Sequence, residues 1–264
     1  MITTNLKSRL ALLRNAVQAL KKHEDRFSRK IMSVDIFPGG VALTWFDRWQ
    51  KQGWRVLSKP VDAQRSMILN QRQVIAHARS EIVLYTEDDV VVNQLPQLTT
   101  IQKLFNENMI KGKRVGFMCF NNHVWSRFNE DPEHIINFIN DLGNYMIIDG
   151  DVFLVKNEVV KDDYYLNFPV AVTTKSLFLE LQDYALEHKR GLGVERGMTR
   201  AWFDTGKDKE YAVVVSLKPE VIHDIKLGKQ ITVVDFYNYA NINFWSNDPH
   251  LRHESVAGRS NSYF

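Results

Sequence analysis

The sequence predicts an α/β fold, a single domain with a mostly parallel central sheet flanked by helices. Short β-prone runs alternate with amphipathic segments from residue 2 to about residue 110, an order typical of parallel strands joined by helical crossovers. The run at 82–86 ends on three consecutive carboxylates, and in open α/β sheets ligands bind at the carboxyl ends of the strands. With 264 residues, 44% of them hydrophobic, the chain can bury a substantial core.

The first half of the chain alternates strand and helix in order. A short apolar start at 2–4 precedes a segment in which Leu10, Leu13, Val17 and Leu20 recur at helical spacing. The next expected elements are a strand at 30–37, a helix at 41–52, a strand at 54–58, a helix at 64–79 and the acidic strand at 82–86. No linker interrupts this order, so we expect no domain boundary before about residue 110.

The second half continues with further strands and helices. The expected elements are a strand at 113–120, a helix at 132–142, two short strands within 145–155, a helix within 191–202 and a strand at 211–224. The two short strands flank Asp149-Gly150-Asp151, and the last strand passes a break at Lys218-Pro219.

The acidic triplet, Glu87, Asp88 and Asp89, is the main chemical signal. It lies between the apolar runs 82–86 and 90–92. Packed carboxylates repel one another and are costly to desolvate, so a cation or a set of donors is needed to compensate them. Their hard oxygen atoms favour Mg²⁺ or Mn²⁺, with further ligands supplied by substrate phosphates. The triplet predicts a divalent metal site, and the alternative is a solvated acidic turn.

Composition adds few constraints. A net charge of +3 and a pI near 8.8 suit an anionic substrate such as a nucleotide diphosphate or a nucleic acid. The single cysteine, Cys119, excludes an intramolecular disulfide. The sequence shows no secretory signal and no apolar run approaching 18 residues, so we expect a cytoplasmic protein without a membrane span. It does not indicate the oligomeric state.

The acidic triplet and its preceding strand resemble the metal-binding element of GT-A fold glycosyltransferases, in particular those of family 2. The resemblance covers roughly residues 2–225. It implies a nucleotide-sugar half at 1–110, an acceptor half at 111–225, and a C-terminal extension at 226–264 that packs on or closes over the site. It also implies that Asp89 holds the metal, that Asp88 binds the ribose or the sugar, and that Glu87 supports the same end of the donor.

The resemblance assigns further residues of the first half to the nucleotide pocket. Thr3 and Thr4 end the first strand, and Arg9 stands at the start of the following helix. Arg65 and Asn70 lie on the helix before the acidic strand. Asn inside a helix is locally unfavourable unless its amide is used, which is an independent reason to single out Asn70. For Arg9 the alternative is a solvated helix charge.

The helix within 191–202 is the expected source of the catalytic base. Glu195, Met198 and Trp202 fall on one side of it. In similar inverting transferases a Glu-Asp pair opens this helix and its second acid accepts the acceptor proton. Here Arg196 replaces that second acid. Glu195 can take the role, with a pKa raised by burial, and Asp151 is the other candidate acid. Inversion is the favoured stereochemistry, and Arg196 leaves retention open.

His223 is the remaining expected site residue. Similar transferases place a late His after a strand, where it can ligate the metal or contact the diphosphate. The alternative is an ordinary packed or surface residue. Beyond it, the segment 226–264 interleaves aromatic and basic residues, which can stack on a nucleic-acid strand or form a packed cap.

We therefore expect a metal-dependent glycosyltransferase. It would move a sugar from a nucleotide diphosphate sugar, a UDP-sugar by resemblance, to an acceptor hydroxyl with Mn²⁺ or Mg²⁺. The expected acceptor is a glycan or a hydroxymethylated base in DNA, as some bacteriophage enzymes modify, which would place the protein in the host cytoplasm. Two alternatives are a nucleotidyltransferase, although no glycine-rich loop follows the first strand, and a noncatalytic nucleotide- or glycan-binding protein.

Overall fold

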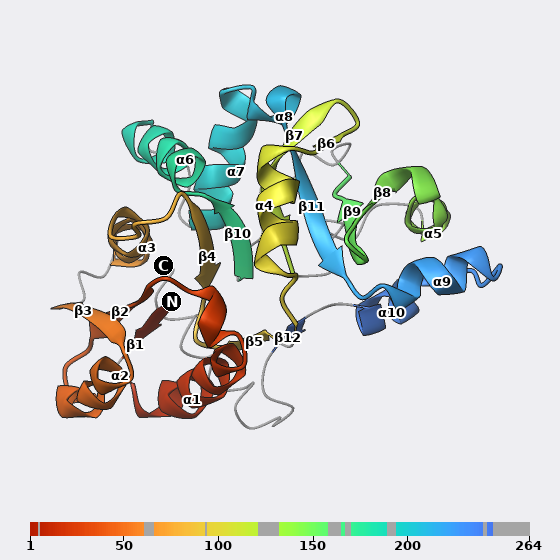
Figure 1. The fold of residues 1–264 in the computed structure, drawn as a ribbon. Coiled ribbons are helices and arrows are strands. Elements are labelled where there is room, and N and C mark those ends of the chain that lie inside the picture. Colours follow the sequence, from red (N-terminus) through yellow and green to blue (C-terminus); the bar gives the residue numbers. More distant parts are fainter. Residues whose placement is uncertain are drawn as a thin grey trace.

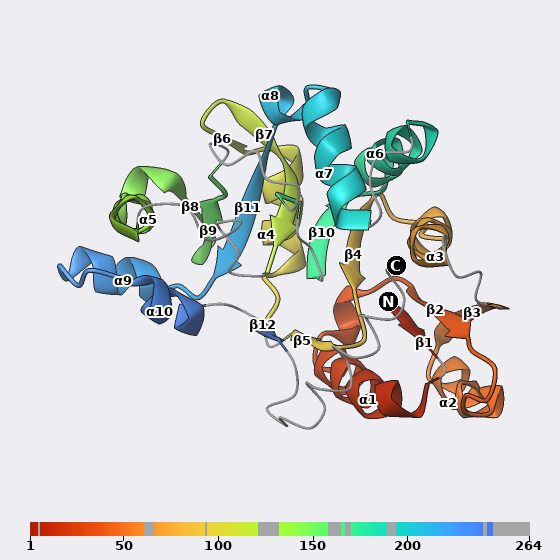
Figure 2. The ribbon, with the colours of Figure 1, turned by 180° about the vertical axis from the view of Figure 1, so that it is seen from behind.

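The protein has a mixed α/β architecture in which helices flank a central sheet (Figure 1). This computed structural model describes residues 1–4, 6–60, 66–92, 94–120, 132–157, 165–166, 170–188, 194–239 and 242–244. A small sheet lies at one end of the molecule, next to the large sheet, and the view from behind shows the same order (Figure 2). No helix in these ranges is long and apolar enough to cross a membrane.

The small sheet is parallel, with strand order β1-β2-β3. Its strands are β1 (Ile2–Thr4), β2 (Lys30–Ile36) and β3 (Trp54–Pro60). Its helical segments are α1 (Lys7–Lys21), η1 (Glu24–Arg26), η2 (Leu43–Trp45), α2 (Asp47–Lys51) and α3 (Ser66–Ala76). Helix α1 buries Leu13, Val17 and Leu20, as the helical spacing predicts. The helix expected at 41–52 is instead a 3-10 turn followed by the short α2.

The large sheet has the order β4-β10-β7-β11-β9-β8, and β6 pairs with β7. Its strands are β4 (Ile82–Thr86), β6 (Met109–Ile110), β7 (Lys113–Cys119), β8 (Tyr145–Ile148), β9 (Asp151–Val155), β10 (Val170–Thr174) and β11 (Tyr211–Leu217). The helical segments around it are α4 (Leu98–Asn106), α5 (Pro132–Asn140), η3 (Leu142–Asn144), α6 (Lys175–Glu187), α7 (Val194–Asp204), α8 (Lys207–Glu210), α9 (Glu220–Lys226), α10 (Val233–Phe236) and η4 (Tyr237–Tyr239).

The large sheet is mixed, so the expectation of a mostly parallel sheet is wrong. Strand β10 runs antiparallel to both β4 and β7, and β9 runs antiparallel to β11 and β8. Among the described strands of this sheet, only β7 and β11 pair in parallel. The β10 segment, at 170–174, is buried and lies between two strands that precede it in sequence, and the local pattern of residues does not encode that insertion.

Gly116 marks an irregularity between the two parallel strands of this sheet. The register shifts between Ala212 and Val213, so Gly116 has no direct partner in the β7–β11 register. A Cβ at Gly116 would lie 3.0 Å from side-chain atoms of Trp202, Leu177 and Tyr211 alike. The fit at glycine is tight because side chains of α6, α7 and β11 pack directly against the backbone.

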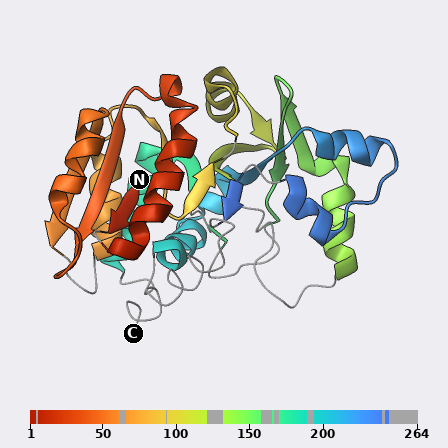
Figure 3. The ribbon, with the colours of Figure 1, turned by 90° about the horizontal axis from the view of Figure 1, so that it is seen from below.

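The C-terminal part of the chain returns to the strand that follows the acidic triplet. Strand β5 (Val90–Val92) follows the acidic triplet and pairs antiparallel with β12 (Ile242–Phe244), with Phe244 opposite Val90. Before that, Ile231 and Phe236 are buried in a core cluster with residues of α5, β9, β11 and α9. The view from below shows α9 and α10 at the end of the molecule opposite β1–β3 (Figure 3).

Candidate functional site

The acidic triplet is buried at the carboxyl end of β4. Glu87, Asp88 and Asp89 are 8%, 1% and 6% exposed. After β4 the chain turns at Asp88 and Asp89 and continues into β5. Burial excludes the solvated acidic turn, and it means that three carboxylates share a poorly hydrated place where compensating groups are required.

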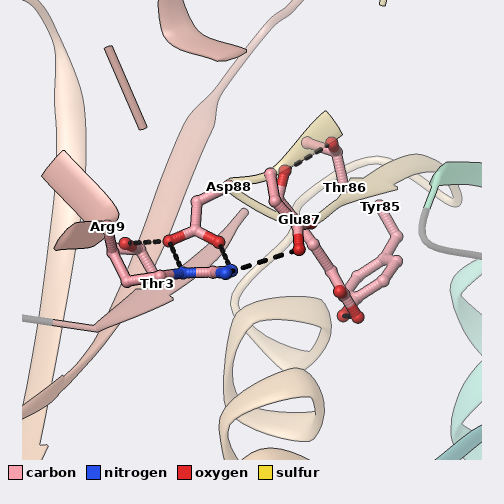
Figure 4. Close-up of polar contacts among 7 residues, drawn as sticks. Thr3, Arg9, Tyr85, Thr86, Glu87 and Asp88 are labelled. Carbon is pink, nitrogen blue, oxygen red and sulfur yellow. Dashed lines mark hydrogen bonds and ion pairs between the residues drawn. The ribbon is translucent and has the colours of Figure 1, made fainter. Parts of the chain in front are cut away.

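Thr3 and Arg9 supply that compensation for Asp88. The Thr3 hydroxyl, at the end of β1, donates to Oδ2 of Asp88 at 2.6 Å. Arg9, in the first turns of α1, donates from Nε to Oδ2 at 3.1 Å and from Nη2 to Oδ1. Figure 4 shows the guanidinium turned toward the Asp88 carboxylate, with Thr3 beside it. The carboxyl ends of β1 and β4 are thereby joined in one polar network, and the solvated-charge alternative for Arg9 is wrong.

The same guanidinium contacts Asp89 more weakly. Arg9 Nη1 lies 3.4 Å from Oδ2 of Asp89. Burial raises the pKa of the Asp88 carboxyl, the Arg9 charge opposes that increase, and the Asp89 charge adds to it. Arg9 therefore favours the ionised form of a carboxyl whose pKa burial raises.

Glu87 belongs to a different network. The Tyr85 hydroxyl donates to Glu87 Oε1 at 3.4 Å and accepts from Gln71 Nε2 at 2.7 Å. Gln182 of α6 donates in turn to Oε1 of Gln71 at 3.1 Å. The structure links Glu87 to α3 and α6, whereas Asp88 and Asp89 face α1.

Asn70 uses its amide, as its place inside a helix predicts, but its partners lie on β2. Its Nδ2 donates to Oδ1 of Asp35, and its Oδ1 accepts from the Ser33 hydroxyl at 3.1 Å. Asn70 is fully buried, and Asp35 is 7% exposed near the carboxyl end of β2. Asp35 was not identified as a site residue from the sequence. The available signal was that Asp35 is a lone acid inside the apolar run at 30–37.

Three expected site residues lie wholly or partly outside the described part of the chain. Arg65 is outside it, and so are the side chains of Thr4 and Glu195. The backbone places Thr4 at the end of β1 and Glu195 in the first turn of α7. The predicted face of α7 is confirmed for Met198 and Trp202, which are 1% and 0% exposed.

Asp151 lies at the same edge of the large sheet as the acids but far along it. It begins β9, whose partner β11 ends beside it, and β9 is four strand positions from β4. At the usual strand spacing this is about 19 Å. Burial raises the pKa of Asp151, while hydrogen bonds from the Gln97 backbone and Thr100 oppose that rise. The structure does not bring Asp151 to Asp89.

His223 is not where the sequence predicted it. It lies on α9, not after a strand, and it is exposed. Strand β11 stops at Leu217, and Pro219 caps the helix that follows, a position suited to proline because helix N-termini leave backbone N–H groups without intrahelical partners. Helix α9 lies at the end of the molecule opposite α1 in all three views, so His223 is not a ligand beside Asp89.

The donor set at the triplet fits a divalent ion only when a substrate adds ligands. In the part of the chain that is described, no group of three or more His, Cys, Asp and Glu side chains could hold a metal. Mg²⁺ is commonly bound by one or two carboxylates together with substrate phosphates. Asp88 and Asp89 can provide that minimal set.

Comparison with known proteins leaves the family open. No protein-family model matches the chain, and no curated protein matches it. Among solved structures, an active-site mutant of LgtC, a GT-A glycosyltransferase, is similar over 76% of this chain and 69% of its own, with 12% sequence identity and a TM-score of 0.36. At that level of similarity the match assigns neither a family nor an activity to this chain.

Proposed function

We propose that the protein is a metal-dependent glycosyltransferase that takes its sugar from a nucleotide diphosphate sugar. One observation carries the proposal: two buried carboxylates, Asp88 and Asp89, lie at the carboxyl end of β4 beside Thr3 and Arg9 from the β1–α1 junction. Ligands of α/β proteins bind at this edge. A diphosphate brings the oxygen ligands that the two acids lack, and Arg9 brings a cation able to pair with phosphate.

Asp89 is the acid best suited to hold the ion. Its contact with Arg9 is 3.4 Å, whereas Asp88 accepts from both Arg9 and Thr3 at 3.1 Å or less. Binding a cation at Asp89 therefore leaves the bonds from Arg9 Nε and Thr3 to Asp88 intact. The bound ion would neutralise charge on the leaving diphosphate. Asp88 keeps Arg9 oriented and so fixes the position of a cation next to the donor.

The acceptor and its base belong to the same proposal. Glu195 stands in the first turn of α7, and we assign it the role of accepting the acceptor hydroxyl's proton. The acceptor is a glycan hydroxyl, with a hydroxymethylated base in DNA as the second substrate to test. The donor is a UDP-sugar by the resemblance of the acidic strand.

The Arg9 network also supports a second candidate, a nucleotide- or glycan-binding protein without catalysis. In it Arg9 would compensate Asp88 and Asp89 permanently, and the triplet would serve only to join α1 to β4. The two candidates differ in whether a bound donor is cleaved.

The deciding experiment is slow donor hydrolysis. The protein is incubated with UDP-sugars in Mn²⁺ and UDP release is measured for the wild type, Asp89→Asn and the control Asp47→Asn, which changes an exposed acid of α2. We expect release by the wild type and the control but not by Asp89→Asn, with circular dichroism unchanged. Donor binding without release supports the noncatalytic candidate, and equal release by a folded Asp89→Asn refutes the role of that acid.

A further inference from the structure

A cavity lies along the first half of β4 and extends to the end of this strand that is away from the acids. Its volume is about 450 Å³, and it is bordered by the segment before β2, the end of α3 and the start of β4. Strand β4 has five residues, so the part of the lining at the start of this strand is about 17 Å from the acidic turn. The lining is mixed: its apolar side chains include Phe27, Val74, Ile75, Leu84 and Leu98, and its polar ones include Arg26, Gln102 and Asn106.

Arginines gather at the mouth of this cavity. We define the arginine rim as Arg29, Arg55 and Arg79; Arg29 and Arg79 line the cavity, and Arg55 stands next to Ile31 across the β2–β3 pair. Arg29 donates one hydrogen bond, from Nη1 to the carbonyl of His77 at 3.2 Å. Within the described ranges, neither Arg55 nor Arg79 forms an ion pair, and both are exposed.

Among the described residues, no carboxylate forms an ion pair with an arginine of the rim. Burial lowers the pKa of Arg29, and the charges of Arg79 and Arg55 lower it further. The arginines are therefore close enough to repel one another. The acid that lines the cavity, Glu81, accepts at Oε1 from the Ser176 backbone N–H at 3.0 Å and from the Ser176 hydroxyl. A concentration of cations without a matching anion favours an oxyanion ligand.

Two serines complete the set of donors. Ser28 and Ser80 stand next to Arg29 and Arg79 in sequence, line the same cavity, and have their Oγ atoms 3.0 Å apart. Guanidinium groups with hydroxyl groups beside them are a donor set suited to a phosphate, which accepts several hydrogen bonds at once. The cavity directly behind the donors adds room for an organic group.

We propose that the arginine rim binds the phosphate of a small phosphate ester, whose apolar body enters the cavity. The site is separate from the acidic turn, and the proposal does not depend on the glycosyltransferase assignment. It predicts that an ester binds more tightly than inorganic phosphate, because only the ester contacts the apolar part of the lining.

The test is calorimetric titration of the full chain with phenyl phosphate and with inorganic phosphate. The variant is Arg79→Ala, which removes an exposed rim charge without breaking a described hydrogen bond. The matched control is Arg48→Ala, an exposed arginine of α2 that does not line the cavity. We expect Arg79→Ala to weaken phenyl phosphate binding by at least about tenfold, the effect of losing a hydrogen bond to a charged group. The control should bind as the wild type does.

Three results would overturn the proposal. Equal affinity for phenyl phosphate and inorganic phosphate would show that the cavity is not used. Unchanged binding by Arg79→Ala would place the phosphate elsewhere. Stronger binding of a single-stranded oligonucleotide without terminal phosphates, with an affinity that falls steeply with salt, would assign the rim to a nucleic-acid backbone instead.

Discussion

Replacing Arg9 with methionine should strongly destabilise the protein, because it removes the cation from a buried carboxylate. Asp88 is 1% exposed and accepts two hydrogen bonds from Arg9, whose own side chain is only 16% exposed. Removing one partner of a buried ion pair costs about 3–5 kcal/mol. The Thr3 hydroxyl still donates to Asp88 at 2.6 Å, so we expect a loss of about 3 kcal/mol at pH 7, the lower end of that range.

The loss should depend on pH in a defined direction. Burial raises the pKa of Asp88 above its ordinary 3.8, and without Arg9 the pKa rises further. A carboxyl with a raised pKa contributes its full stability below the unfolded-state pKa and loses it as the pH rises through the folded-state pKa. The difference in unfolding free energy between wild type and Arg9→Met should therefore be smallest near pH 4 and widen toward pH 7.

The assay is urea unfolding followed by circular dichroism, with a double-mutant cycle. The cycle adds Asp88→Asn and the double variant, and we expect a coupling energy of about 2 kcal/mol, within the range for residues in one polar network. Arg14→Met is the control because Arg14 is an exposed arginine of the same helix. A destabilisation below about 1 kcal/mol at pH 7, or a difference that narrows as the pH rises, would refute the reasoning.

Three further substitutions test other features. Asn70→Ala should cost about 1–3 kcal/mol in urea unfolding, because Asp35 loses a donor at a buried position. Gly116→Ala should cost about 1–3 kcal/mol, because the new methyl group meets Trp202 at 3.0 Å; unchanged stability would show that the helices can shift. Asp149→Asn should remove a pH-dependent contribution to the stability of the fold. The hydrogen bond from Lys103 lowers the pKa of Asp149 below 3.8. The stabilisation by the Asp149 carboxylate is therefore present above that pH and is lost as the pH falls further. Melting temperatures measured at pH 3 and pH 6 should differ less in this variant than in the wild type.

The sequence predicted the acidic turn well because its signal was local. Apolar residues on both sides implied that the triplet is buried, and burial of carboxylates implied compensating donors, which Arg9 and Thr3 supply. The two short strands around Asp149 and Gly150 were likewise predicted. In the structure both residues have the positive φ that a tight turn requires.

The wrong predictions concern features that depend on contacts between residues far apart in the sequence. Strand direction in the large sheet depends on where β10 inserts, and a short buried run reads the same in a parallel or an antiparallel sheet. The position of His223 followed from treating the break at Pro219 as an interruption of one strand, whereas the proline starts a helix. Asp35 was overlooked because its role depends on α3 packing against β2, which brings Asn70 to it.

The pairing of β12 with β5 has a consequence for when the neighbours of the acidic turn become available during synthesis. Thr3 and Arg9 leave the ribosome before Asp89, but the strand that borders the turn on its other side ends at Phe244, opposite Val90. At about 5–20 residues per second, this last strand emerges roughly eight to thirty seconds after Asp89. During that interval β5 is an unpaired edge next to the acids. The complete set of strand pairs beside the acidic turn can therefore form only after translation has passed residue 244.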